Sequence, residues 1–157
     1  MTARVRPLTN ADREWARAWI TEEWGLPVVS PSGVYDDPAA LDGFVVEEGG
    51  RPVGLLLDKI AEGRCEVVAL VVREQRRGHG RALMEAARAA AQSSGCDRVW
   101  LITTDENPDA LAFYTSLGMT ETQRHLNFAD TVRRSKPDST RHRAASDYRD
   151  AIELEWR

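Results

Sequence analysis

Residues 65–82 read CEVVALVVREQRRGHGRA, and this stretch sets the fold class of the chain. The apolar run from Val67 to Val72 is typical of a strand that is buried on both faces. Gly78 and Gly80 follow it and open a helical pattern that continues to Ser94. Glycines let a backbone approach a ligand closely, and the N–H groups at a helix start attract anions. The stretch therefore predicts a strand, an anion-binding turn and a helix.

Arginines concentrate at this turn although the net charge of the chain is −4. Arg73, Arg76, Arg77 and Arg81 lie there beside a single acid, Glu74. Guanidinium groups pair well with phosphates, so the cluster favours a phosphate ligand. The alternative is a glycine-rich turn with solvated arginines. A Walker loop and the dinucleotide fingerprint are excluded, because the residues that define them do not follow.

The pattern outside this stretch predicts a mixed sheet with helices. We expect helices over about 10–24, 81–94 and 107–118, a long loop over 25–40, and strands over 4–8, 43–48, 52–60, 65–72, 98–103, 119–127 and 151–156. Tight glycine turns predict that the strands between 43 and 72 are antiparallel. The strand–helix–strand unit over 65–103 predicts a parallel pair. These elements indicate one α/β domain over residues 1–157.

Composition narrows the function classes. The chain has 157 residues, with 42% hydrophobic and 29% charged, which is typical of one soluble domain. No apolar run is long enough to span a bilayer and no secretory signal is visible, so a cytoplasmic protein is expected. Cys65 and Cys96 are too few for a disulfide framework, and no metal site is expected. The basic segment 124–149 is interpreted as a solvated tail, and no nucleic-acid partner is expected.

A second pattern follows about 30 residues after the turn. Residues 107–114 read NPDALAFY, and residues 117–119 read LGM. Residues 75–80, with Gln75, Gly78 and Gly80, resemble motif A of the GNAT superfamily of N-acetyltransferases, which is Gln/Arg-x-x-Gly-x-Gly/Ala. Residues 107–119 resemble its motif B, with Met119 in place of the usual Phe. The resemblance is firm over about 43–128.

The resemblance implies a three-layer sandwich with helices on both faces. Its mixed, mostly antiparallel sheet would be splayed at an acetyl-CoA site. The implied reaction is direct transfer of an acetyl group from acetyl-CoA to a primary amine of a small molecule or peptide. The implied acetyl-CoA contacts are Leu70, Val71 and Val72 along the pantetheine arm, then Arg76, Arg77, Gly78, His79, Gly80 and Arg81 at the pyrophosphate, and Asn107.

The resemblance also implies catalytic roles. Tyr114 would return a proton to the leaving thiolate, and Glu66 is the candidate base that deprotonates the amine. The alternatives are an amphipathic core tyrosine and an exposed glutamate at the start of a strand. His79 occupies a variable position of the motif and is not expected to be catalytic.

The sequence says less about the residues that contact the acceptor amine. Residues 21–42 contain acids and no base, and they include Trp24 and Tyr35. Carboxylates attract cationic amines and aromatic rings stack on them, so Trp24 and Tyr35 are candidate acceptor contacts. The alternative is an acidic surface loop that keeps the protein soluble. The sequence leaves open whether the protein forms a homodimer.

Two other functions compete with catalysis. The first is an acyl-CoA-binding sensor of the same fold that does not turn over, and the second is a phosphate- or nucleotide-binding protein of another class. The presence of Tyr114 favours the enzyme.

Overall fold

The computed structural model describes residues 3–30, 33–74, 77–105, 108–128, 130 and 150–156. Its main sheet has seven strands in the order β1-β4-β5-β6-β7-β9-β8, and β2 and β3 form a separate hairpin. The strands are β1 Ala3–Pro7, β2 Val28–Ser30, β3 Gly33–Tyr35, β4 Asp42–Glu48, β5 Arg51–Ala61, β6 Arg64–Val72, β7 Arg98–Thr104, β8 Thr120–His125 and β9 Ala151–Trp156. The helices are α1 Arg13–Trp24, α2 His79–Ser93 and α3 Pro108–Ser116, with short 3-10 turns at Asn10–Asp12 and Pro38–Ala40.

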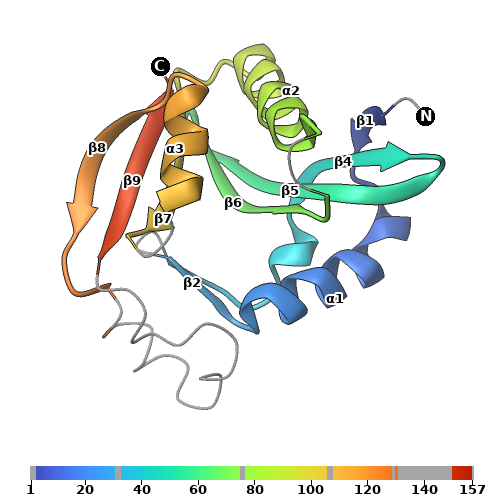
Figure 1. The fold of residues 1–157 in the computed structure, drawn as a ribbon, viewed down its shortest axis with the longest axis horizontal. Coiled ribbons are helices and arrows are strands. Elements are labelled where there is room, and N and C mark those ends of the chain that lie inside the picture. Colours follow the sequence, from blue (N-terminus) through green and yellow to red (C-terminus); the bar gives the residue numbers. More distant parts are fainter. Residues whose placement is uncertain are drawn as a thin grey trace.

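Apolar side chains on both faces of the sheet create the three layers. Leu55 and Leu57 of β5 pack against α1, where Ala16 and Ile20 are fully buried one helical turn apart. Leu56 points to the other face, where it joins Leu83 of α2 in a second core. Figure 1 shows α1 below the sheet and α2 above it. The α/β sandwich with helices on both faces is therefore confirmed.

The strand pairing also agrees with the sequence pattern. The β4–β5 and β5–β6 pairs are antiparallel, and β6 pairs with β7 in parallel. The position of β9 was not evident from the sequence, because β9 enters between β7 and β8 and pairs antiparallel with both. No helix among the described residues is long and apolar enough to cross a membrane.

Strands β6 and β7 diverge at the centre of the sheet (Figure 1). Their pairing covers only Arg64–Val67 and Arg98–Leu101, although β6 continues to Val72 and β7 to Thr104. Beyond that point β6 stays paired with β5, and β7 stays paired with β9. The edge of β6 over residues 68–72 is thus left without a β7 partner in the described part of the chain.

A β-bulge lies at the same point. Leu57 pairs with Ala69 and Asp58 pairs with Val67, so Val68 is the extra residue of β6. As a result Val67 and Leu70 both contact the α2 core, whereas Ala69 and Val71 contact the α1 core. A bulge increases the local twist, which helps to turn the end of β6 away from β7.

Two sequence expectations need correction. Residues 25–40 were expected to form a loop, but they contain the β2–β3 hairpin. Helix α2 begins at His79 rather than at Arg81, because Gly78 adopts the left-handed conformation (φ 76°, ψ 8°) of a helix N-cap and lets the helix start directly after it. The solvated tail expected over 124–149 lies mostly outside the described residues.

Candidate active site

The turn before α2 presents backbone N–H groups at the end of β6. Helical hydrogen bonding begins with the N–H of Ala82, which donates to the carbonyl of Gly78 at 3.0 Å. The N–H groups of His79, Gly80 and Arg81 therefore precede the helical ladder, in the position where a helix N-terminus binds an anion. Gln75 and Arg76 of this turn lie outside the described residues.

Gly80 is required by the packing of α3 as well as by the turn. A β-carbon at Gly80 would lie 3.0 Å from Cζ of Phe113, which is closer than real β-carbons normally come to a neighbouring atom. The two motifs of the sequence thus meet in space, since Gly80 belongs to the first and Phe113 to the second. Gly80 lets α3 approach the start of α2 closely.

The arginines of the turn are partly neutralised. Arg77 forms ion pairs with Glu48 at 3.2 Å and with Glu74 at 3.0 Å, and its side chain is about half exposed. Arg81 lies 3.9 Å from Glu85, a long and exposed contact. Exposed pairs of this kind contribute about 0–1 kcal/mol, so a phosphate can replace a carboxylate partner at low cost.

The side chain of His79 faces the sheet rather than the turn. It is 3% exposed, and its Nε2 lies 3.3 Å from Oε2 of Glu48 on β4. Contact between His79 and a phosphate would therefore use the backbone N–H. This placement supports the expectation that His79 has no catalytic role.

Arg73 links the same region to α1. Its guanidinium lies 4.2 Å from the ring centroid of Trp19, and it pairs with Glu22 at 3.2 Å. One of the acids expected to attract a cationic acceptor is thus engaged with an arginine of the turn region. Asp37, another of these acids, pairs with Arg17 at 2.9 Å.

Tyr114 lies on α3 and packs against the α2 core. Its ring centroid is 5.2 Å from that of Phe113, and part of its surface remains exposed. Desolvation raises the pKa of Tyr114 to about 12. The phenol therefore keeps its proton at neutral pH, as a proton donor must. Asn107 lies outside the described residues.

Glu66 and Tyr35, which are far apart in the sequence, are in direct contact. Oη of Tyr35 donates to Oε1 of Glu66 at 2.7 Å, and Oγ of Ser30 lies 3.4 Å from Oε2. Glu66 is only 7% exposed, so the alternative of an exposed glutamate is wrong. The hairpin covers this carboxylate, and the sequence interpretation missed both the hairpin and Ser30. Two short runs, 28–30 and 33–35, separated by two residues are a hairpin signal that could have found it.

The other candidate acceptor residue lies elsewhere. Trp24 ends α1 and packs against the α1 core together with Leu26 and Val28. It therefore supports the base of the hairpin, and its contact with an acceptor stays a prediction. Leu70, Val71 and Val72 lie on the part of β6 beyond its pairing with β7, where the sequence interpretation placed the pantetheine arm.

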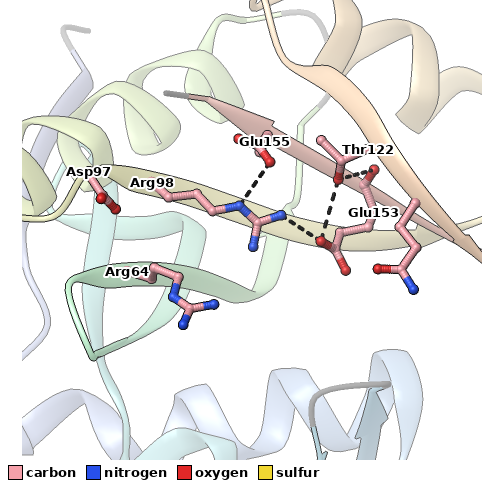
Figure 2. Close-up of a pocket in the computed structure, with 7 residues that line it drawn as sticks. Arg64, Asp97, Arg98, Thr122, Glu153 and Glu155 are labelled. Atoms are coloured by element: carbon pink, nitrogen blue, oxygen red, sulfur yellow. Dashed lines mark hydrogen bonds and ion pairs between the residues drawn. The ribbon is translucent and has the colours of Figure 1, made fainter.

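A polar cavity of about 290 Å³ opens on the face of the sheet that carries Glu66 (Figure 2). Arg98 lies at its centre, with Nη2 2.5 Å from Glu153 and Nε 3.0 Å from Glu155. Arg64 lines the cavity and lies two residues before Glu66 on β6, but Glu66 is not one of the lining residues. The lining residues are Arg64, Asp97, Arg98, Thr122, Gln123, Glu153 and Glu155.

Comparisons with known proteins agree with this geometry. The pattern of the acetyltransferase (GNAT) family matches residues 8–119. The chain is 31% identical over 136 residues to the uncharacterized protein YxbD of Bacillus subtilis (strain 168), a match that covers 85% of each protein.

Two solved structures share the fold. The ribosomal-protein-S18-alanine N-acetyltransferase of Escherichia coli superposes with a TM-score of 0.73 at 20% identity, over 98% of this chain and 92% of that one. Arabidopsis thaliana NAA60 in complex with acetyl-CoA gives a TM-score of 0.70 at 14% identity, over 99% of both chains. The sequence match covers most of the chain and both motifs, so the protein belongs to the acetyltransferase (GNAT) family and is an acyltransferase.

Proposed function

We propose that the protein transfers an acetyl group directly from acetyl-CoA to a primary amine of a small molecule or peptide. The observation that carries this proposal is the divergence of β6 from β7 immediately before the turn at Gly78 and Gly80. The edge of β6 from which β7 diverges suits the amide groups of a pantetheine arm, which can bond to a strand edge as an added strand would. The turn at its end suits the pyrophosphate.

The acetyl-CoA site follows from this arrangement. Backbone N–H groups from His79 to Arg81 bind the pyrophosphate, and the Arg77 and Arg81 side chains add positive charge. Leu70, Val71 and Val72 align the arm, and a backbone N–H near Leu70 stabilises the oxyanion. Support comes from the related fold of NAA60, which binds acetyl-CoA. Contacts of Arg76 and Asn107 with the cofactor stay predictions.

Two residues on opposite faces of the sheet, Tyr114 and Glu66, have the proposed catalytic roles. Tyr114 protonates the leaving thiolate, since a tyrosine phenol carries its proton at neutral pH. Glu66 receives the proton of the acceptor amine. Among the described residues both cysteines are free, and burial raises the pKa of the fully buried Cys65 to about 12. Cys65 is therefore a poor nucleophile, which supports transfer without an acyl-enzyme.

Two observations bear on the chemical class of the acceptor amine. The structural relative from Escherichia coli acts on the alanine of a ribosomal protein, which supports a peptide amine, and the polar cavity lined by Arg64 and Arg98 is compatible with a polar small molecule. Trp24 and Tyr35 are the proposed contacts. A single domain over 1–157, a cytoplasmic location and a homodimer stay predictions.

A panel of amines tests the proposal. The protein is mixed with acetyl-CoA and, in turn, with amino acids, peptides with a free α-amine, polyamines and amino sugars, and release of free thiol is followed. We expect thiol release that depends on the amine and yields the matching acetamide by mass spectrometry. Tight binding of acetyl-CoA without release for any amine would instead favour the sensor function.

A further inference from the structure

The buried carboxylate of Glu66 is held by side chains of the β2–β3 hairpin. Tyr35 donates to Oε1 at 2.7 Å, a short bond of the kind formed between a hydroxyl and a charged carboxylate. Ser30 lies 3.4 Å from Oε2, at the limit of a hydrogen bond. In Figure 1 this hairpin extends from the end of α1 toward β7.

Exposure differs between the two members of the Tyr35–Glu66 pair. Glu66 is 7% exposed, whereas Tyr35 is only partly buried and its neighbour Val34 is 56% exposed. Tyr35 is therefore the more accessible member of the pair. A buried base behind a more accessible hydroxyl is the arrangement of a proton relay, as in other catalytic pairs in which a hydroxyl lies against a base.

We propose that Tyr35 relays the proton of the acceptor ammonium to Glu66, an inference that rests on the proposed acetyl transfer. The ammonium N–H bond breaks as its proton moves to Oη of Tyr35, and the Oη–H proton of Tyr35 moves to Oε1 of Glu66. The amine keeps the electron pair and becomes a neutral nucleophile, tyrosine remains a phenol, and Glu66 becomes a neutral acid. Glu66 returns the proton to solvent by the reverse path after the product leaves.

Charged groups on both neighbouring strands lie near the pair. Lys59 is the cross-strand partner of Glu66 on β5, and its Nζ lies 5.8 Å from the ring centroid of Tyr35. A cation at this position disfavours the ammonium, which favours loss of its proton, but it also favours the charged carboxylate, which opposes proton uptake by Glu66. On β7, the partner of Glu66 is Trp100, which lies 5.1 Å from Arg98, and Arg98 is neutralised by Glu155. Arg64 is the other charged residue on this face of β6.

A series of acceptors with decreasing amine pKa separates a relay from a structural contact. Alkylamines are protonated at neutral pH, whereas hydrazines and aromatic amines are largely neutral and need no base. We expect Tyr35→Phe to lower kcat/KM about a hundredfold for an alkylamine and only slightly for a neutral amine. Glu66→Gln shows the same dependence, and the double variant is no slower than either single variant, because the two residues act in one path.

Two control variants are measured with the same series of amines. Val34→Ala alters the same hairpin without touching the pair, and its rates stay close to those of the wild type for every amine. Tyr114→Phe is slowed for every amine, since thiolate protonation does not depend on amine pKa. The acetyl-CoA affinity of Tyr35→Phe, measured by calorimetry, is unchanged, which shows that the variant is folded.

The outcomes separate the relay from the proposed function. A rate loss in Tyr35→Phe that is equal for all amines, or additive with Glu66→Gln, overturns the relay and leaves Tyr35 as a structural contact. Full activity of Tyr35→Phe overturns it as well. If Tyr35→Phe does not fold, a loss in Glu66→Gln that ignores amine pKa overturns it. Absence of thiol release from the wild type with every amine overturns the proposed function itself.

Discussion

The two ends of β6 build the two halves of the site in different ways. The proposed donor half, residues 68–81, is contiguous in the chain, and its described residues present mainly backbone groups, namely the edge of β6 beyond its pairing with β7 and the N–H groups before α2. The acceptor half consists of Glu66 and the β2–β3 hairpin. Its key contact joins two side chains, Tyr35 and Glu66, that are 31 residues apart.

This difference separates what is common to the fold from what is particular to this chain. In the proposed site, backbone groups bind acetyl-CoA through a strand edge and a helix terminus, which many sequences can form. Side chains from a short hairpin determine what meets Glu66, and they change with each substitution. Variants of the donor half should therefore affect acetyl-CoA binding, and variants of the acceptor half should affect the amine.

The largest effect is expected where the halves meet, at the reacting thioester. Tyr114→Phe removes the proton donor while keeping the ring that packs beside Phe113. We expect kcat to fall about 10²–10⁴-fold with little change in acetyl-CoA affinity. Steady-state rates and calorimetry measure the two quantities. Unchanged kcat, with the chemical step shown to limit the rate, would remove Tyr114 from the mechanism.

A smaller effect is expected within the donor half. Gly80→Asp places a side chain 3.0 Å from Phe113 and a negative charge at the pyrophosphate site, so the acetyl-CoA Kd should rise at least about tenfold. Gly80→Ala should show the steric part alone, and adding Phe113→Leu should recover most of that loss. If folded Gly80→Asp binds acetyl-CoA as the wild type does, the pyrophosphate lies elsewhere.

Sequence patterns predicted the strand β6 and the helix α2 but missed the β2–β3 hairpin, and chain distance explains why. The apolar run 67–72 and the glycines after it interact with near neighbours, so their pattern indicates their structure. The hairpin has strands of three residues each, too short for clear alternation, and it is fixed by contacts with β6. The position of β9 between β7 and β8 is likewise a tertiary outcome.

The smallest effect on activity is expected at Asp58, which belongs to neither half. This β5 carboxyl is 5% exposed, and desolvation, together with the nearby Asp42, raises its pKa to about 6. A carboxyl with a raised pKa in the folded state binds its proton more tightly than in the unfolded state. Its favourable contribution is present below about pH 4 and is lost as the pH rises through about 6.

Asp58→Asn removes this pH dependence. Relative to the wild type, the variant should gain about 2–3 kcal/mol of unfolding free energy between about pH 4 and pH 8, while kcat and both KM values stay the same. Urea denaturation at the two pH values measures the gain. A stability difference that does not change with pH would refute a buried Asp58 with a raised pKa. A change in kcat would mean that Asp58 on β5 influences the donor or the acceptor half of the site.

Direct transfer from the donor half to the acceptor half is most sharply tested by a single turnover. The protein is loaded with acetyl-CoA labelled in the acetyl group, mixed with an active amine, quenched at intervals, and analysed by intact mass. The label should pass from acetyl-CoA to the amine at least as fast as kcat, and the protein should never gain the mass of an acetyl group. An acetylated protein that forms before the product, or in the absence of amine, would show a covalent intermediate and disprove direct transfer.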